Sequence, residues 1–176
     1  MKRQAILLLL LVCWLSCSPT FALSTPPDRL PLVILSEEIR HLDLRAEALF
    51  YADQLAIDSS SVIRVVLSLQ LEDDRAGIIQ YQNADIGTKP HQFLIHLNKR
   101  NTFSQLSTTL AHEMVHAQQY VIGDLQKVDR EDFIWKGERF RNVSRIRYLE
   151  RPWEQDAIHR GMELRKAFLE SAPCLP

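Results

Sequence analysis

The sequence is poor in cysteine and carries no excess of either charge. Two of its three cysteines fall within the first 22 residues. Only Cys174 lies beyond them, and a single cysteine cannot form an internal disulfide. The 21 basic and 22 acidic residues give a formal net charge of −1, whereas nucleic-acid-binding domains usually carry a basic stripe. We therefore expect no disulfide framework and no nucleic-acid partner.

Long hydrophobic runs are also missing, apart from one near the N-terminus. The apolar run over residues 5–15 follows two basic residues and precedes small residues that end at Ala22. This is the pattern of a secretory signal peptide, and we assign it to residues 1–22. The run is shorter than the about 20 residues that a membrane span needs. We predict export to the periplasm or secretion without a membrane span. A lipid anchor at Cys17 is the alternative, which Trp14 in its processing site disfavours.

Internal repeats and low-complexity tracts are absent, so the rest of the chain fits one domain. Residues 23–35 contain three prolines and are interpreted as an extended lead-in, and residues 36–176 as a single domain. Periodicity and turn residues predict helices at 36–54, 102–122 and 152–171, strands at 61–71, 78–81 and 93–97, a loop at 83–90 and a hairpin at 133–143. This order indicates an α+β fold with a small, mostly antiparallel sheet.

The sequence His-Glu-Met-Val-His at residues 112–116 is the feature that points to chemistry. On a helix, residues four apart lie on one face, so His112 and His116 can bind one ion. Two imidazoles at this spacing suit a tetrahedral zinc ion. Glu113 can then lie beside a water on the metal and act as its general base.

The context of this motif is helical. Thr102 and Gln105 form a capping-box pattern at the start, and Gly123 is a stop signal at the end. An apolar stripe at helical spacing lies on the face opposite the two histidines, and it consists of Leu106, Leu110, Met114, Ala117 and Val121. The competing interpretation is a surface helix with two incidental histidines.

Residues 109–119, Thr-Leu-Ala-His-Glu-Met-Val-His-Ala-Gln-Gln, resemble the active-site helix of the zincin metallopeptidases. They are most similar to small bacterial members with a glutamate as third ligand, the gluzincin pattern. The resemblance extends over roughly residues 93–158. It implies a minimal zincin-like domain, one zinc ion per chain, and a C-terminal helix that carries the third ligand.

Several residues downstream could supply that third ligand. The extended motif that continues with Gly and His is excluded, because Gln and Ile occupy those positions. The remaining candidates are Glu150, Glu154, Asp156 and His159. At about 100° per residue, Glu154 falls at the centre of the apolar arc of the last helix, whereas Asp156 and His159 fall on its polar side. A carboxylate in a buried stripe is costly unless it is paired or binds a metal. We predict Glu154 as the ligand, and a salt bridge to Arg165 or to a neighbouring arginine is the competing interpretation.

The resemblance also suggests how a substrate is held. Zincins similar to this chain lay an extended peptide along the edge strand before the metal helix. This points to Phe93, Leu94 and Ile95 as an edge strand that lines the cleft. Tyr148 and His96 are candidates for contacts with the transition state or the substrate, although core packing or exposure on the surface is the simpler interpretation of each.

Together these features predict an exported zinc metallopeptidase that cleaves a peptide or protein substrate. Water activated by the metal attacks the peptide carbonyl, and Glu113 accepts its proton and passes it to the leaving amine. The alternative is a zinc-binding module of the cell envelope that keeps the fold without turnover. A purely structural site does not need a base at Glu113, so this residue favours the enzyme.

Overall fold

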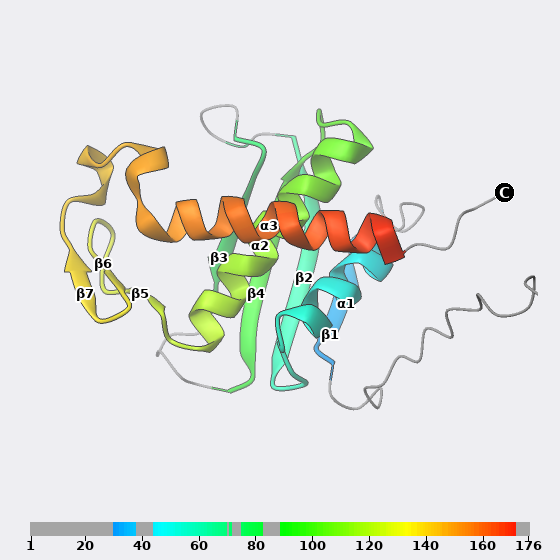
Figure 1. The fold of residues 1–176 in the computed structure, drawn as a ribbon, viewed down its shortest axis with the longest axis horizontal. Coiled ribbons are helices and arrows are strands. Elements are labelled where there is room, and N and C mark those ends of the chain that lie inside the picture. The colour runs from blue at the N-terminus through cyan, green and yellow to red at the C-terminus, as the bar shows by residue number, and fades with distance from the viewer. Residues whose placement is uncertain (1–29, 38–43, 70, 72–74, 83–88, 172–176) are drawn as a thin grey trace, which may run out of the picture.

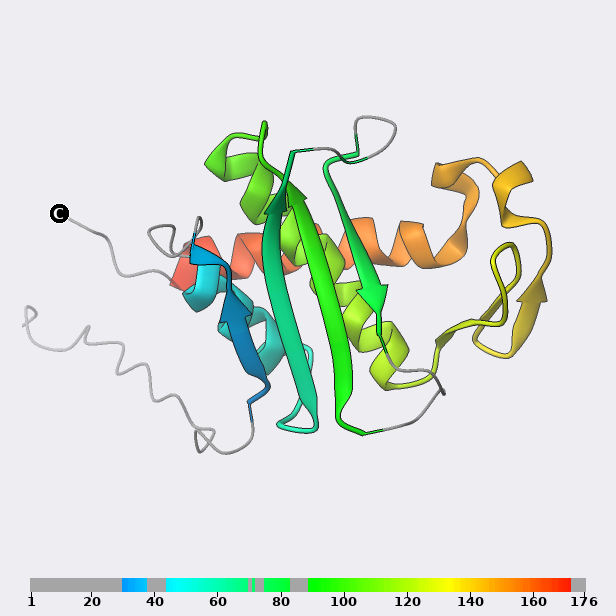
Figure 2. The ribbon, with the colours of Figure 1, turned by 180° about the vertical axis from the view of Figure 1, so that it is seen from behind.

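The body of the molecule is a four-stranded sheet with three helices on one of its faces. The computed structural model describes residues 30–37, 44–69, 71, 75–82 and 89–171. In Figure 1, α3 crosses in front of α2 and the sheet lies behind both helices. Figure 2 shows the opposite face of the sheet, with the helices behind it. The architecture is α+β, as the sequence predicts.

The elements follow one another as β1 (Leu32–Leu35), α1 (Leu44–Gln54), β2 (Ser61–Ser68), β3 (Gly77–Tyr81), β4 (His91–Asn98), α2 (Phe103–Val121), β5 (Leu125–Lys127), β6 (Phe133–Trp135), β7 (Glu138–Phe140), the 3₁₀ helices η4 (Val143–Arg145) and η5 (Tyr148–Glu150), and α3 (Pro152–Ser171). Among the described residues, none of these helices has both the length and the apolar character that a bilayer span requires.

The main sheet has the strand order β1-β2-β4-β3. β1 pairs with β2 and β2 with β4 in parallel, and only β3 runs antiparallel to its neighbour β4. The prediction of a mostly antiparallel sheet is therefore wrong for the sheet that carries the metal helix. α1 joins two parallel neighbours as a crossover, and β3 reverses the chain at the far edge, so that β4 can return parallel to β2.

The middle of the main sheet supplies the core. Buried side chains alternate along β2 and β4, and both strands direct them to the face that the helices cover. Ile63 lies opposite Phe93 and Val65 lies opposite Ile95 in the parallel register. These four side chains are at most 1% exposed. They pack beneath Leu110 and Met114 of α2.

The predicted substrate strand does not lie at an edge. Phe93, Leu94 and Ile95 belong to β4, which is paired with β2 on one side and with β3 on the other. The prediction that this segment binds an extended peptide is wrong, because its backbone groups already pair within the sheet. The edge strand nearest to the metal helix is β3 instead.

The N-terminal boundaries also differ from the prediction. The end of the expected lead-in, Leu32–Leu35, forms strand β1 of the main sheet. The amide of Ser36 continues the ladder by donating to Val65 O, and residues 38–43 of the expected helix lie outside the described residues. In the described residues α1 begins at Leu44. The proposed signal peptide at residues 1–22, with Cys17, lies outside the described residues, as do residues 83–88 of the expected loop.

Helix α2 begins and ends as the sequence predicts. The Thr102 side chain accepts from the Gln105 amide, and the Gln105 side chain accepts from the Thr102 amide, which completes the capping box. At the other end Gly123 has a φ of 78°, a left-handed conformation that favours glycine after a helix. Both ends of the metal helix are therefore fixed by local sequence.

Between α2 and α3 the chain forms a small antiparallel sheet, β5-β6-β7. The predicted hairpin is confirmed, with Lys136 and Gly137 both at positive φ in its turn. Trp153, at the start of α3, stacks on Phe133 of β6 and meets Phe140 of β7 edge-on. This second apolar cluster anchors the first turn of α3, which carries Glu154.

Candidate metal centre

The three predicted ligands lie together between α2 and α3. Their ligand atoms are all within 4.8 Å of one another, so His112, His116 and Glu154 could hold a metal ion. His116 Nε2 is 3.0 Å from His112 Nε2 and 3.1 Å from Glu154 Oε2. His112 Nε2 is 3.3 Å from the same carboxylate oxygen. The cluster joins residues that are 38 positions apart in the sequence.

These separations fit a tetrahedral ion. Zinc ligands at about 2.0–2.1 Å from the metal, at tetrahedral angles, lie roughly 3.3 Å from one another. The three observed distances, 3.0, 3.1 and 3.3 Å, are close to that value. Two imidazoles and one carboxylate are also the donor set of one group of catalytic zinc sites, which leave a fourth position for water or substrate.

Small residues on α3 bring the two helices together. Ala157 is fully buried, one turn after Glu154. At Gly161 an added β-carbon would lie 3.1 Å from both Cα and N of His112. α3 therefore approaches α2 closely after Glu154, and Gly161 makes a tight contact.

Glu154 is held as a carboxylate. It is 9% exposed, and burial alone would disfavour its charge. Hydrogen bonds from His112 and His116, together with the charge of His116 and a hydrogen bond from Tyr148, outweigh burial and hold the pKa of Glu154 well below its ordinary value. The group therefore presents the ionised form that a metal requires.

Glu113 lies beside these ligands rather than among them. It is 5% exposed, and burial raises the pKa of its carboxyl, although the nearby His116 and His112 partly oppose that rise. The backbone amide of Ile79, on β3, donates to this carboxylate. On the same strand, a β-carbon added to Gly77 would come within 3.4 Å of Glu113 Oε1. The edge strand thus packs directly over the predicted base.

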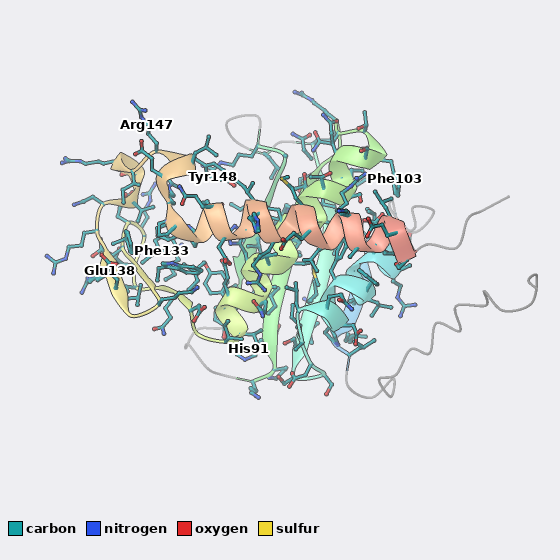
Figure 3. All side chains as sticks on the ribbon, viewed as in Figure 1. His91, Phe103, Phe133, Glu138, Arg147 and Tyr148 are labelled. Carbon is teal, nitrogen blue, oxygen red and sulfur yellow. The ribbon has the colours of Figure 1, made fainter. Side chains whose placement is uncertain are left out.

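Tyr148 reaches the centre from η5, just before α3. Figure 3 shows it close to the first turns of α3. Its hydroxyl is 3.1 Å from His112 Nε2, and the residue remains 48% exposed. Burial of the hydroxyl and the charge of Glu154 raise the pKa of Tyr148 well above its usual range. Its phenol therefore stays protonated and can donate a hydrogen bond.

His96 does not lie at the centre. Along β4 the side chains of Phe93, Ile95 and Leu97 face the helices, so His96 points to the opposite face of the sheet. There its Nδ1 lies 2.8 Å from Ser68 Oγ on β2. The candidate role of His96 in a substrate contact is wrong, since the sheet separates it from the metal ligands.

The competing partners of Glu154 are engaged elsewhere. Arg165 donates to Ser107 Oγ and Ser104 Oγ on α2, not to Glu154. His159, the alternative ligand, is exposed and lies 3.6 Å from Glu163 on the outer side of α3. The structure therefore favours Glu154 as the third ligand over His159, and it shows no salt bridge between Glu154 and Arg165.

Gln119, which no sequence motif singles out, also belongs to the centre. Its side chain is fully buried, and its Oε1 lies 2.8 Å from Nδ1 of His116. Its position three residues after His116 places it next to that ring on the helix. Its burial depends on contacts with α3, which is distant in the sequence, so no local pattern predicts it.

Comparisons with protein families, with curated proteins and with solved structures find no match.

Proposed function

We propose that this protein is a zinc-dependent peptide hydrolase of the zincin kind, exported to the periplasm or secreted. The observation that carries the proposal is the meeting of His112, His116 and Glu154 with Glu113 beside them. A site that only stores or stabilises a metal does not need a buried carboxylate next to its ligands. The active-site helix and a C-terminal helix with the third ligand are also the arrangement that the resemblance to gluzincins implies.

His112, His116 and Glu154 hold the ion from one side. When bound there, zinc supplies a Lewis acid for the substrate carbonyl and lowers the pKa of water towards 7. Glu113 accepts the proton of the attacking water and delivers it to the leaving amine. Burial raises the pKa of this carboxyl, which brings it nearer to the pH at which a general base works best.

Tyr148 and β3 complete the proposed site. The phenol of Tyr148, already within hydrogen-bond distance of His112, donates to the negative oxygen that develops on the substrate. β3 is the strand at the sheet edge, and it contacts Glu113 through Ile79. An extended peptide that pairs with this edge presents its backbone to the base with little dependence on side-chain identity.

The test is cleavage of an unfolded protein by the purified mature chain, with its zinc content measured in the same sample. We expect about one zinc ion per chain and cleavage that stops with a chelator and returns with zinc. Glu113→Gln is the matched control: it is nearly isosteric and is not a ligand, so it should keep the zinc. Loss of a general base should slow cleavage at least about a hundredfold.

The outcomes separate the proposal from its rival. Full cleavage by Glu113→Gln, or cleavage that ignores the chelator, contradicts the assigned mechanism. A parent protein that binds zinc and cleaves no peptide, folded or unfolded, is instead a metal-binding module of the envelope.

A further inference from the structure

Gln119 forms hydrogen bonds to both ligand-bearing helices at the metal centre, and each of its polar atoms has a partner. Its Oε1 lies 2.8 Å from Nδ1 of His116 on its own helix. Its Nε2 donates across to α3, to Trp153 O at 3.1 Å and to Asp156 Oδ2 at 2.8 Å. The side chain has no exposed surface, so water cannot replace these bonds.

The neighbours determine which way the amide points. A backbone carbonyl only accepts hydrogen bonds, and Asp156 Oδ2 already accepts one from Arg160 Nη1 at 3.2 Å. Both acceptors therefore require the NH₂ group of Gln119. Its oxygen must face His116 and can only accept, so Nδ1 of His116 carries the hydrogen.

With a hydrogen held on Nδ1, Nε2 is the nitrogen of His116 that gives up its proton when a metal binds. Nε2 is the atom that faces His112 and Glu154, and a metal binds only an unprotonated nitrogen. The second bond of Gln119, to Trp153 O, holds the peptide carbonyl directly before Glu154. One side chain thus fixes the tautomer of one ligand and the backbone next to another.

We propose that Gln119 is a positioning residue of the metal centre, which acts through His116 and through the first turn of α3 without touching the ion. This inference rests on the proposed metal site, not on peptide hydrolysis. Partners of this kind usually contribute about 10- to 100-fold to metal affinity. Carboxylates often serve in that role, whereas here a neutral amide contacts His116. The amide is in turn hydrogen-bonded to Asp156, which pairs with Arg160.

The experiment compares Gln119→Leu with Gln118→Leu. Gln118 is a matched control on the same turn: it also bonds a backbone carbonyl, that of Leu55, and accepts from Arg160, but it does not contact a ligand. Zinc affinity is measured by competition with a chromophoric chelator. The ¹⁵N shifts of the His116 ring in the zinc-bound protein report which nitrogen carries the hydrogen.

We expect Gln119→Leu to lower zinc affinity about 10- to 100-fold and to shift the Nδ1 resonance of His116, whose hydrogen loses its acceptor. Gln118→Leu should leave both unchanged, even where it lowers thermal stability. Unchanged zinc affinity in Gln119→Leu, or a parent protein whose His116 carries its hydrogen on Nε2, overturns the inference.

A second variant covers the case in which Gln119→Leu does not fold. Gln119→Met keeps a side chain of similar length in the buried position, but it cannot donate to Trp153 O and offers His116 only a weak thioether acceptor. It should also lower zinc affinity about 10- to 100-fold, and an unchanged affinity contradicts the inference. None of these measurements uses a substrate, so a protein that fails to hydrolyse peptides can still pass them.

Discussion

Gly161 on α3 lies directly against His112 on α2, with room for no side chain between them. A β-carbon at Gly161 would come 3.1 Å from the Cα and N of His112. Those are backbone atoms of a helix, which cannot turn aside as a flexible side chain can. The separation of the two ligand-bearing helices is therefore set at this contact.

The first prediction concerns that contact. Gly161→Ala should push the helices apart and weaken zinc binding, because Glu154 then moves away from the two histidines. Overpacking costs about 1–3 kcal/mol, against a gain of about 1 kcal/mol in helix propensity. Zinc affinity and thermal unfolding of the metal-free protein test it. A variant that is more stable and binds zinc as well as the parent shows that the helices are free to separate.

The second prediction distinguishes the third ligand from its alternative. Glu154→Ala should reduce zinc affinity by more than the roughly 10- to 100-fold that loss of an outer partner costs. His159→Ala should leave it unchanged, since that side chain is 75% exposed and faces Glu163. Equilibrium zinc binding to the two variants in parallel is the measurement. The reverse result would falsify the assignment.

The third prediction tests the donor role of Tyr148. Tyr148→Phe should keep the fold and the zinc, since the hydroxyl is not in the ligand set, and should lower turnover about 100- to 1000-fold. Leu149→Ala, at an exposed neighbour on η5, is the control for local disturbance. Steady-state cleavage kinetics decide between the two roles: equal rates for parent and Tyr148→Phe would leave the tyrosine as a packing residue.

The fourth prediction is a pH dependence of stability away from the metal. His91 is the first residue of β4 (Figure 3), and it is 4% exposed. Its Nδ1 lies 3.1 Å from the Tyr81 hydroxyl. Burial, and then the charge of Lys89, lowers its pKa from the ordinary 6.5.

The sign of the effect follows from that shift. Between the folded pKa and about 6.5 the unfolded chain binds more protons. The free energy of unfolding should therefore fall as the pH falls through this window, and the contribution is fully present above it. Denaturant unfolding at neutral and mildly acidic pH measures the fall, which should be smaller in His91→Gln. The same fall in both proteins would assign the effect to another group.

Local patterns predicted the elements that carry the site better than the sheet that supports them. Thr102, Gln105 and Gly123 fix the limits of α2 through bonds within a few residues. The position of Glu154 follows from the periodicity of α3 alone. Capping and helical periodicity are short-range properties. The structure shows the capping box of α2 and brings Glu154 to the two histidines, as these properties imply.

Strand order and strand faces depend on partners that are distant in the sequence. Nothing within residues 93–97 indicates that β2 and β3 flank them, so the central strand was taken for an edge. The face of the sheet on which His96 lies could be predicted, because His96 alternates with Phe93, Ile95 and Leu97. The polarity of Gln119 by itself favours an exposed position. Only the packing of α3 makes this side chain a buried partner of His116.

The small sheet β5-β6-β7 connects α2 to α3. The chain leaves α2 after Val121 and enters α3 near Trp153, whose ring packs against Phe133 and Phe140. As long as that entry into α3 is kept, the outer turns of the small sheet can change in length or sequence without moving Glu154. The region thus offers a grafting position: new loops inserted at Lys136 and Gly137 should leave the ligand geometry as it is.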